Sequence, residues 1–213
     1  VANAGGANAY DVSITGTTNS IAGATTFLNS GTTTIGNALG DATTFTGGVV
    51  AAAGPKNIAG AINTTNTAMN LGTTAVAVTD NATLNAGSNT ITLGAATLAD
   101  GKSLTLGTGS ATTINTGSIT GDAATGAAEN LTINTAGVAT IGGAVGAVPL
   151  GTITITQSGG TSFSSTVDAA TVAITDTADA AAVAFTGNLT LTTGMTVANA
   201  GGANAYDVSI TGT

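Results

Sequence analysis

Carboxylates are almost the only side chains in this sequence with the chemistry for acid–base catalysis or metal binding. The chain has no His, Arg or Cys, and its cationic side chains are Lys56 and Lys102. Asp176 and Asp179, supported by Asp168, form the strongest candidate group. A pair of carboxylates can hydrolyse a glycoside, but single acids among turn residues are usually solvated side chains that favour the turn. We therefore predict no catalytic residue and no enzymatic activity.

The same acids are the candidate ligands for a metal ion. Calcium takes six to eight oxygen ligands from carboxylates, carbonyls and water, and the loop around Asp176 and Asp179, with Asp168 before it, offers carboxylates. Residues 5–11, GGANAYD, lack the second glycine signal of a calcium-binding nonapeptide and do not recur at nine residues. The sequence predicts no cofactor, and calcium at these three aspartates is the open alternative.

Composition and charge exclude several kinds of partner. Ten acidic residues against two lysines give a net charge of −8, which opposes binding to a phosphate backbone, so we expect no nucleic acid partner. No apolar run approaches the roughly 20 residues of a membrane span, and we expect no such span. With 42% hydrophobic residues, the chain has enough apolar surface to bury a core.

Short segments in which Thr alternates with aliphatic residues lie between the acids. Examples are 90–93 (TITL), 103–106 (SLTL) and 152–156 (TITIT). Such alternation predicts strands with one buried face, and the Gly, Asn, Asp and Ser clusters between them predict turns. We expect an all-β chain.

Apolar residues recur along the second half of the chain at steps of 19 to 21 residues. The core ladder defined by these steps is Leu93, Ile114, Ile133, Ile153, Val172, Leu191 and Ile210. It predicts a parallel β-solenoid (β-helix), right-handed by analogy, with about ten rungs of 19–20 residues. A softer ladder places all four Phe residues in one column. Tandem β-sandwich domains are the alternative, although such domains normally contain more than 3% aromatic residues.

The two ends of the sequence are identical over seventeen residues. Residues 1–17 and 197–213 both read VANAGGANAYDVSITGT. We interpret 1–196 as one repeat unit of a continuous solenoid and 197–213 as the start of the next. The predicted junction residues are Val1, Tyr10, Ile14, Val197, Tyr206 and Ile210. Ile14 and Ile210 are then expected at the same position of the coil, ten rungs or about 48 Å apart.

A row of threonines immediately before the apolar ladder predicts a regular surface of hydroxyl groups. Its members are Thr92, Thr113, Thr132, Thr152, Thr171 and Thr190. Ice binding is one use of such a surface, but Thr is also simply a good, soluble strand former.

The Thr-, Gly-, Ala- and Asn-rich strands without Cys resemble bacterial β-strand-repeat surface proteins of the filamentous haemagglutinin-like and autotransporter passenger types. The resemblance covers nearly the whole chain and includes 188–197, NLTLTTGMTV, which runs into the duplicated segment. It implies a right-handed parallel β-helix, export from the cell, an extracellular or cell-surface location, and a role in adhesion or matrix building.

These features predict a structural protein, an extracellular filament or matrix built from head-to-tail solenoid repeats. Its main partner is then another copy of itself, with lateral bundling of rods as a further contact. The alternative is an adhesin stalk or passenger that binds glycans or partner cells. An ice-binding protein or a polysaccharide-active β-helix is the third hypothesis.

Overall fold

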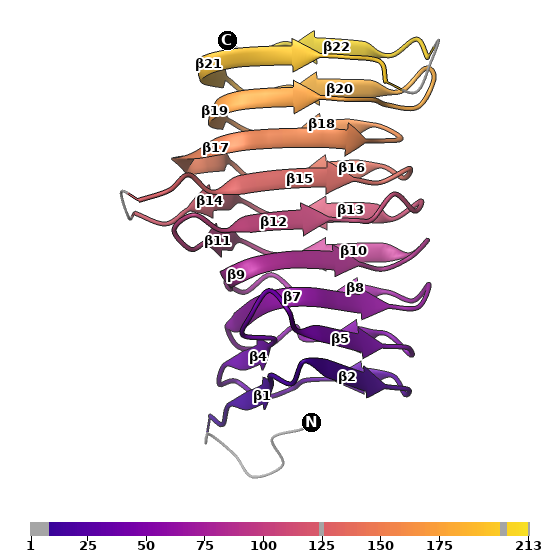
Figure 1. Cartoon of the computed structure of the whole chain (residues 1–213), viewed down its shortest axis with the longest axis vertical. Helices are drawn as coiled ribbons and strands as arrows, with labels where there is room; N and C mark the ends of the chain where they lie inside the picture. The colour runs from indigo at the N-terminus through magenta and orange to yellow at the C-terminus, as the bar shows by residue number, and fades with distance from the viewer. Residues whose placement is uncertain (1–8, 124–125, 201–203, 213) are drawn as a thin grey trace.

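Parallel strands stacked in nine coils along one axis make up the molecule (Figure 1). The computed structural model describes residues 9–123, 126–200 and 204–212. Every strand pairing in these ranges is parallel. The same ranges contain strands and no helix, and hence no helix long and apolar enough to cross a membrane. The predicted all-β solenoid is confirmed.

Each coil crosses three faces, and five long strands bend across the corner between the first two. Face 1 contains β1 (Val12–Ile14), β4 (Thr33–Ile35), β11 (Ala96–Leu98), β14 (Ile119–Gly121) and the first parts of β7 (Lys56–Thr64), β9 (Val76–Asn85), β17 (Val145–Gln157), β19 (Val167–Ile174) and β21 (Leu189–Val197). Face 2 contains β2 (Thr18–Ile21), β5 (Ala42–Phe45), β12 (Ser103–Leu106), β15 (Asn130–Asn134) and the second parts of the same five long strands.

Face 3 closes each coil with one short strand. It contains β3 (Thr25–Thr26), β6 (Val49–Val50), β8 (Met69–Asn70), β10 (Thr90–Leu93), β13 (Thr113–Thr116), β16 (Ala139–Ile141), β18 (Thr161–Phe163), β20 (Ala182–Phe185) and β22 (Asp207–Ile210).

The core lies inside the coils because side chains alternate along each strand. In β10, Ile91 and Leu93 are buried while Thr90 and Thr92 are partly exposed. The parallel register sets Ile91 directly below Ile114 in the next coil. Each inward position therefore continues as a stack along the axis, and the stacks form one hydrophobic core.

The coils average about 22 residues, which is longer than the 19–20 expected. On face 1 the first strand begins at residue 12 and the ninth at residue 189, so eight steps cover 177 residues. Nine coils thus take the place of the predicted ten or so.

The longer coil breaks the predicted core ladder into pieces on different faces. Leu93, Ile114 and Ile210 lie on face 3; Ile133, Ile153 and Val172 lie on face 2; Leu191 lies on face 1. Of these residues, Ile153 and Val172 are paired in register, whereas Ile133 pairs with Ile155. The single ladder was wrong because steps of 19–20 fall two or three residues short of each coil and drift backwards from face to face. Five of its seven members are nevertheless buried, and Ile210 is 55% exposed.

The four Phe residues form two separate pairs instead of one column. Phe27 and Phe45 meet edge to face in the first coils, with ring centroids 6.2 Å apart. Phe163 and Phe185 stack in parallel near the other end of the rod, 4.8 Å apart. The second distance is the inter-strand spacing itself, since these rings occupy one stack on face 3.

One cationic side chain points into the core. Lys56 begins the core-facing part of β7, is 1% exposed, and lies in register between Thr33 and Val76. Its Nζ donates to the carbonyl oxygen of Gly54 at 2.9 Å and to the hydroxyl of Thr74. Burial lowers the pKa of Lys56 below its ordinary 10.5, because desolvation penalises the ammonium form.

We predict that Lys56→Met changes how stability depends on pH. Between the lowered folded pKa of Lys56 and about 10.5, the unfolded chain binds more protons than the folded one, so wild-type stability rises with pH in this window. Urea unfolding of both chains between pH 7 and 10.5 measures the effect, and tyrosine titration cancels in their difference. The free energy of unfolding of the wild type is expected to rise relative to that of the variant as pH increases. Parallel pH profiles would contradict a pKa of Lys56 lowered by burial.

Candidate functional site

The three aspartates considered for calcium are not brought together. Asp168 lies in the face 1 part of β19, while Asp176 and Asp179 follow the face 2 end of that strand. Asp176 accepts a hydrogen bond from the backbone N–H of Thr177 at 3.0 Å, and Asp179 accepts one from that of Ala205 at 2.9 Å. Asp176 therefore serves as a local turn acceptor and Asp179 as an acceptor for the backbone of the next coil, and β19 separates both from Asp168.

The two copies of the duplicated segment lie on different faces. Ile14 pairs with Ile35 in β1 and β4 on face 1, whereas Ile210 pairs with Phe185 in β22 and β20 on face 3. The expectation that Ile14 and Ile210 share one coil position was therefore wrong for this end of the stack. The reason is the last coil, in which β22, the next strand after the face 2 end of β21, lies on face 3.

The other junction residues flank these strands. Tyr10 lies two residues before β1, and Val197 ends β21 on face 2. Tyr206 precedes β22 and donates its hydroxyl to the carbonyl oxygen of Ala198. Burial raises the pKa of Tyr206, and the negative charge of Asp176 adds to the shift. Val1 lies outside the described residues.

The predicted threonine row is also interrupted by the true register. Thr92 pairs with Asn115, and Thr132 pairs with Thr154, so the row of the sequence ladder does not run along one face. A different row, on face 2, does continue in register through four coils. Its members are Thr83, Thr105, Thr132 and Thr154.

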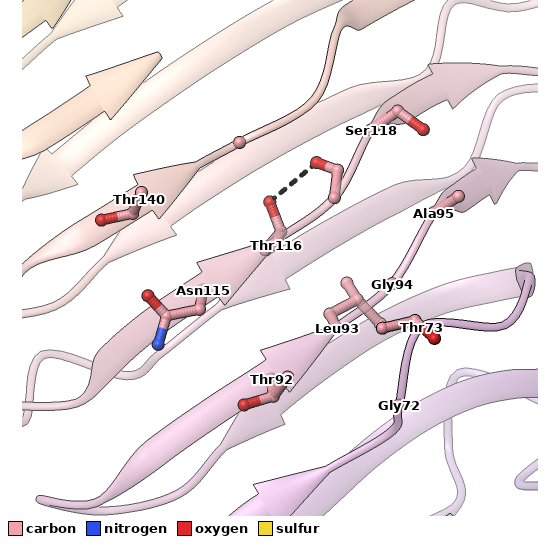
Figure 2. Close-up of a pocket in the computed structure, with 12 residues that line it drawn as sticks. Gly72, Thr73, Thr92, Leu93, Gly94, Ala95, Asn115, Thr116, Ser118 and Thr140 are labelled. Carbon is pink, nitrogen blue, oxygen red and sulfur yellow. Dashed lines mark hydrogen bonds between the residues drawn. The ribbon is translucent and has the colours of Figure 1, made fainter. Parts of the chain in front are cut away.

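A shallow groove of about 470 Å³ follows the corner between face 3 and face 1 (Figure 2). Its polar wall includes Thr92, Asn115 and Thr140, which are consecutive partners in the strand ladder. Ser118 contributes a hydroxyl group at the turn, whereas the hydroxyl of the buried Thr116 donates to the carbonyl oxygen of Gly117 (Figure 2). The lining contains no titratable side chain. Most of the exposed lining is apolar, so the groove suits a neutral ligand with an apolar face that also forms hydrogen bonds with the hydroxyl and amide groups of its wall.

Glycines form this groove because successive turns touch through their backbones. A Cβ added to Gly94 would lie 2.7 Å from the carbonyl carbon of Thr73, and one added to Gly143 would lie 2.4 Å from the backbone nitrogen of Ser118. Real Cβ contacts are essentially never shorter than 3.0 Å. The corner therefore requires residues without side chains, and the surface there is hollow.

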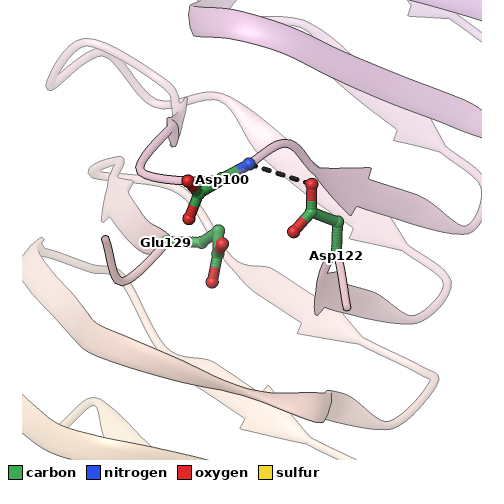
Figure 3. A group of neighbouring side chains, drawn as sticks. All are labelled: Asp100, Asp122 and Glu129. Atoms are coloured by element: carbon green, nitrogen blue, oxygen red, sulfur yellow. Dashed lines mark hydrogen bonds between the residues drawn. The ribbon is translucent and has the colours of Figure 1, made fainter. Parts of the chain in front are cut away.

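Three other acids, which were not among the predicted site residues, meet at a corner between face 1 and face 2. Asp100, Asp122 and Glu129 each place a carboxylate oxygen within 4.8 Å of the other two (Figure 3). Asp100 and Asp122 are 22 residues apart, which is one mean coil, and Glu129 is the single glutamate of the sequence. The true coil length was the signal needed to find them.

Comparisons of the chain with protein-family models, curated proteins and solved structures find no match.

We predict that Gly143→Ala destabilises the protein while Gly23→Ala is nearly neutral. The first change forces a Cβ against the backbone of the preceding coil, and overpacking of this kind costs about 1–3 kcal/mol. A Cβ at Gly23 meets nothing within 4 Å, which makes it a matched control. Denaturant unfolding at equilibrium measures both. Equal stability of the two variants would show that the turns are not in backbone contact at this corner.

Proposed function

We propose that the protein is a structural component, an extracellular or cell-surface filament in which solenoid units continue head to tail. The observation that carries this proposal is the agreement of two independent lengths. The sequence repeats after 196 residues, and the coils of about 22 residues place almost nine whole turns in that length. Nine whole turns would return a second unit to the orientation of the first, as a continuous rod requires.

The outermost coils favour the same arrangement. Val12, Ile14 and Ile21 in the first coil, and Leu189, Leu191 and Met195 in the last, pack on the core but stay partly exposed. The equivalent positions of interior coils are buried, because a neighbouring coil covers each side. Uncovered strand edges with apolar side chains pair readily with further strands. A second copy of the unit is the occupant that carries the matching strands.

A continuous rod also requires one rearrangement. Since Ile14 lies on face 1, its counterpart Ile210 must move from face 3 to face 1 when the next unit follows. There the strand would pair with the first part of β21, Val208 beside Leu189 and Ile210 beside Leu191. Both strands read apolar, polar, apolar, so the inward and outward positions agree.

Paired cysteines distinguish the two registers. Ala184 and Ser209 are partners on face 3 in the present structure, whereas Thr190 and Ser209 become partners in the continuous rod. Neighbouring strands bring such residues about 5 Å apart, within disulfide range. We expect Ala184→Cys with Ser209→Cys to oxidise in this chain, and Thr190→Cys with Ser209→Cys to oxidise in a chain of two consecutive units.

Mass spectrometry after mild oxidation detects both bonds, and each pair serves as the control for the other. Oxidation of the 184–209 pair alone in the two-unit chain would contradict a continuous solenoid across the junction.

The rod also has a characteristic length per unit. Nine coils at the inter-strand spacing of about 4.8 Å give an axial repeat of about 43 Å, in place of the 48 Å expected from ten rungs. Electron microscopy of assembled multi-unit chains should show this repeat together with the strand spacing along the axis. Isolated, non-stacking particles at high concentration would argue against a filament.

An adhesin stalk is the second candidate, and the groove between face 3 and face 1 favours it. Its size lies within the range of small-molecule sites, and Thr92, Asn115 and Thr140 offer neutral hydrogen-bonding groups. The same uncharged lining is poor material for acid–base catalysis, so we propose binding without chemistry. Loss of glycan binding in Asn115→Ala, with the axial repeat unchanged, would identify this role.

A further inference from the structure

An unusually long corner loop places three carboxylates together. Eight positions, 122–129, separate β14 from β15, where the coil below has only residues 99–102 between β11 and β12. The described residues on either side of 124–125 contact that shorter turn: the N–H of Asp122 donates to the carbonyl of Leu98 at 2.9 Å, and the N–H of Gly101 donates to the carbonyl of Ala127 at 3.0 Å. Two successive corners thus supply Asp100 from below and Asp122 and Glu129 from above.

Glu129 is the member of the cluster whose burial no contact within the fold explains. It is 4% exposed, and its Oε1 is fully buried without a hydrogen-bond partner. A buried, unpartnered carboxylate oxygen costs free energy, and two further carboxylates next to it add repulsion. The arrangement becomes favourable when a cation binds between the three groups.

No cationic side chain performs this task in the part of the chain that the structure describes. Lys102 lies two residues from Asp100, but its Nζ is 3.0 Å from the carboxylate of Asp80. This hydrogen bond holds the pKa of Asp80 below its usual range. Lys56, the other lysine, is bound to Gly54 and Thr74.

Two glycines leave room for the carboxylates. A Cβ on Gly126 would lie 2.0 Å from an oxygen of Asp100, and a Cβ on Gly121 would lie 2.6 Å from an oxygen of Glu129. Side chains at these positions would push the acids out of place. The backbone around the cluster is therefore shaped to keep the three carboxylates together.

We propose that Asp100, Asp122 and Glu129 bind one calcium ion that fastens Asp122 and Glu129 to Asp100 in the coil below. Calcium–oxygen distances are about 2.4 Å, so two ligand oxygens of one ion are at most about 4.8 Å apart, and all three carboxylates satisfy this limit. Water completes the coordination. Magnesium needs shorter distances and a stricter octahedron, so calcium is the better fit.

Titration of the full chain with CaCl2 after removal of divalent ions tests the site. Calorimetry should show one site per chain, and calcium should raise the thermal midpoint and slow hydrogen exchange in residues 119–131. Glu129→Gln keeps the shape and removes one charge. It should weaken calcium binding at least tenfold and abolish the local protection, while its stability without calcium equals or exceeds that of wild type. Asp168→Asn makes the same charge change away from the cluster and should leave calcium binding unchanged.

Several results would overturn the proposal. These are the absence of both binding heat and a thermal shift at millimolar CaCl2, an equal loss of affinity in Asp168→Asn and Glu129→Gln, or tighter binding of MgCl2 than of CaCl2. If Glu129→Gln does not fold, Asp122→Asn provides the same comparison, because Asp122 is only partly buried. The readouts concern one corner of an isolated chain, so they are independent of whether units assemble into filaments.

Discussion

The parallel hydrogen-bonded ladder between successive coils is the constraint on which the rest of this structure depends. It holds neighbouring turns about 4.8 Å apart, so each residue has a counterpart directly above and below it. On a face, this spacing places similar side chains of successive coils above one another, as with the parallel rings of Phe163 and Phe185 at 4.8 Å. At a corner, the same spacing brings backbones into contact and admits only glycine, as at Gly94 and Gly143. Core stacks, hollow corners and polar surface rows are three consequences of one distance.

The sequence was sufficient for the strands and the solenoid but not for the register. Alternation of Thr with aliphatic residues identifies β10 and β12 directly, because it reports which side chains face the core. The pattern repeats every two residues, however, so a shift of two leaves it unchanged. Ile133 matches Ile153 and Ile155 equally well by pattern, and the backbone ladder selects Ile155. The predicted step is two or three residues shorter than the coil, and this difference accumulates from coil to coil. The residues of the predicted ladder are therefore distributed over three faces.

The same ambiguity hid the acidic cluster. Asp176 and Asp179 attract attention because they are close in sequence, yet each is used by a nearby backbone N–H. In a solenoid, the residues that meet are one coil apart, as Asp100 and Asp122 are. Glu129 joins them through an extended corner whose length no periodic pattern encodes. The loops between the periodic segments therefore determine which side chains meet at a corner. Their positions can be predicted only when the coil length is known.

The duplicated segment shows the same freedom of register at the end of the stack. Its Val-Ser-Ile pattern packs on face 1 beside β4 and on face 3 beside β20, because each partner strand presents buried residues at the matching positions: Thr33 and Ile35 in β4, Val183 and Phe185 in β20. An interior coil has no such choice, since the coils on both sides hold it in place. In a stack where each turn contacts only its neighbours, the last strand is held in register from one side alone. In the filament we propose, a unit added at this end would select, from the two positions, the one on face 1 that lets the coils continue.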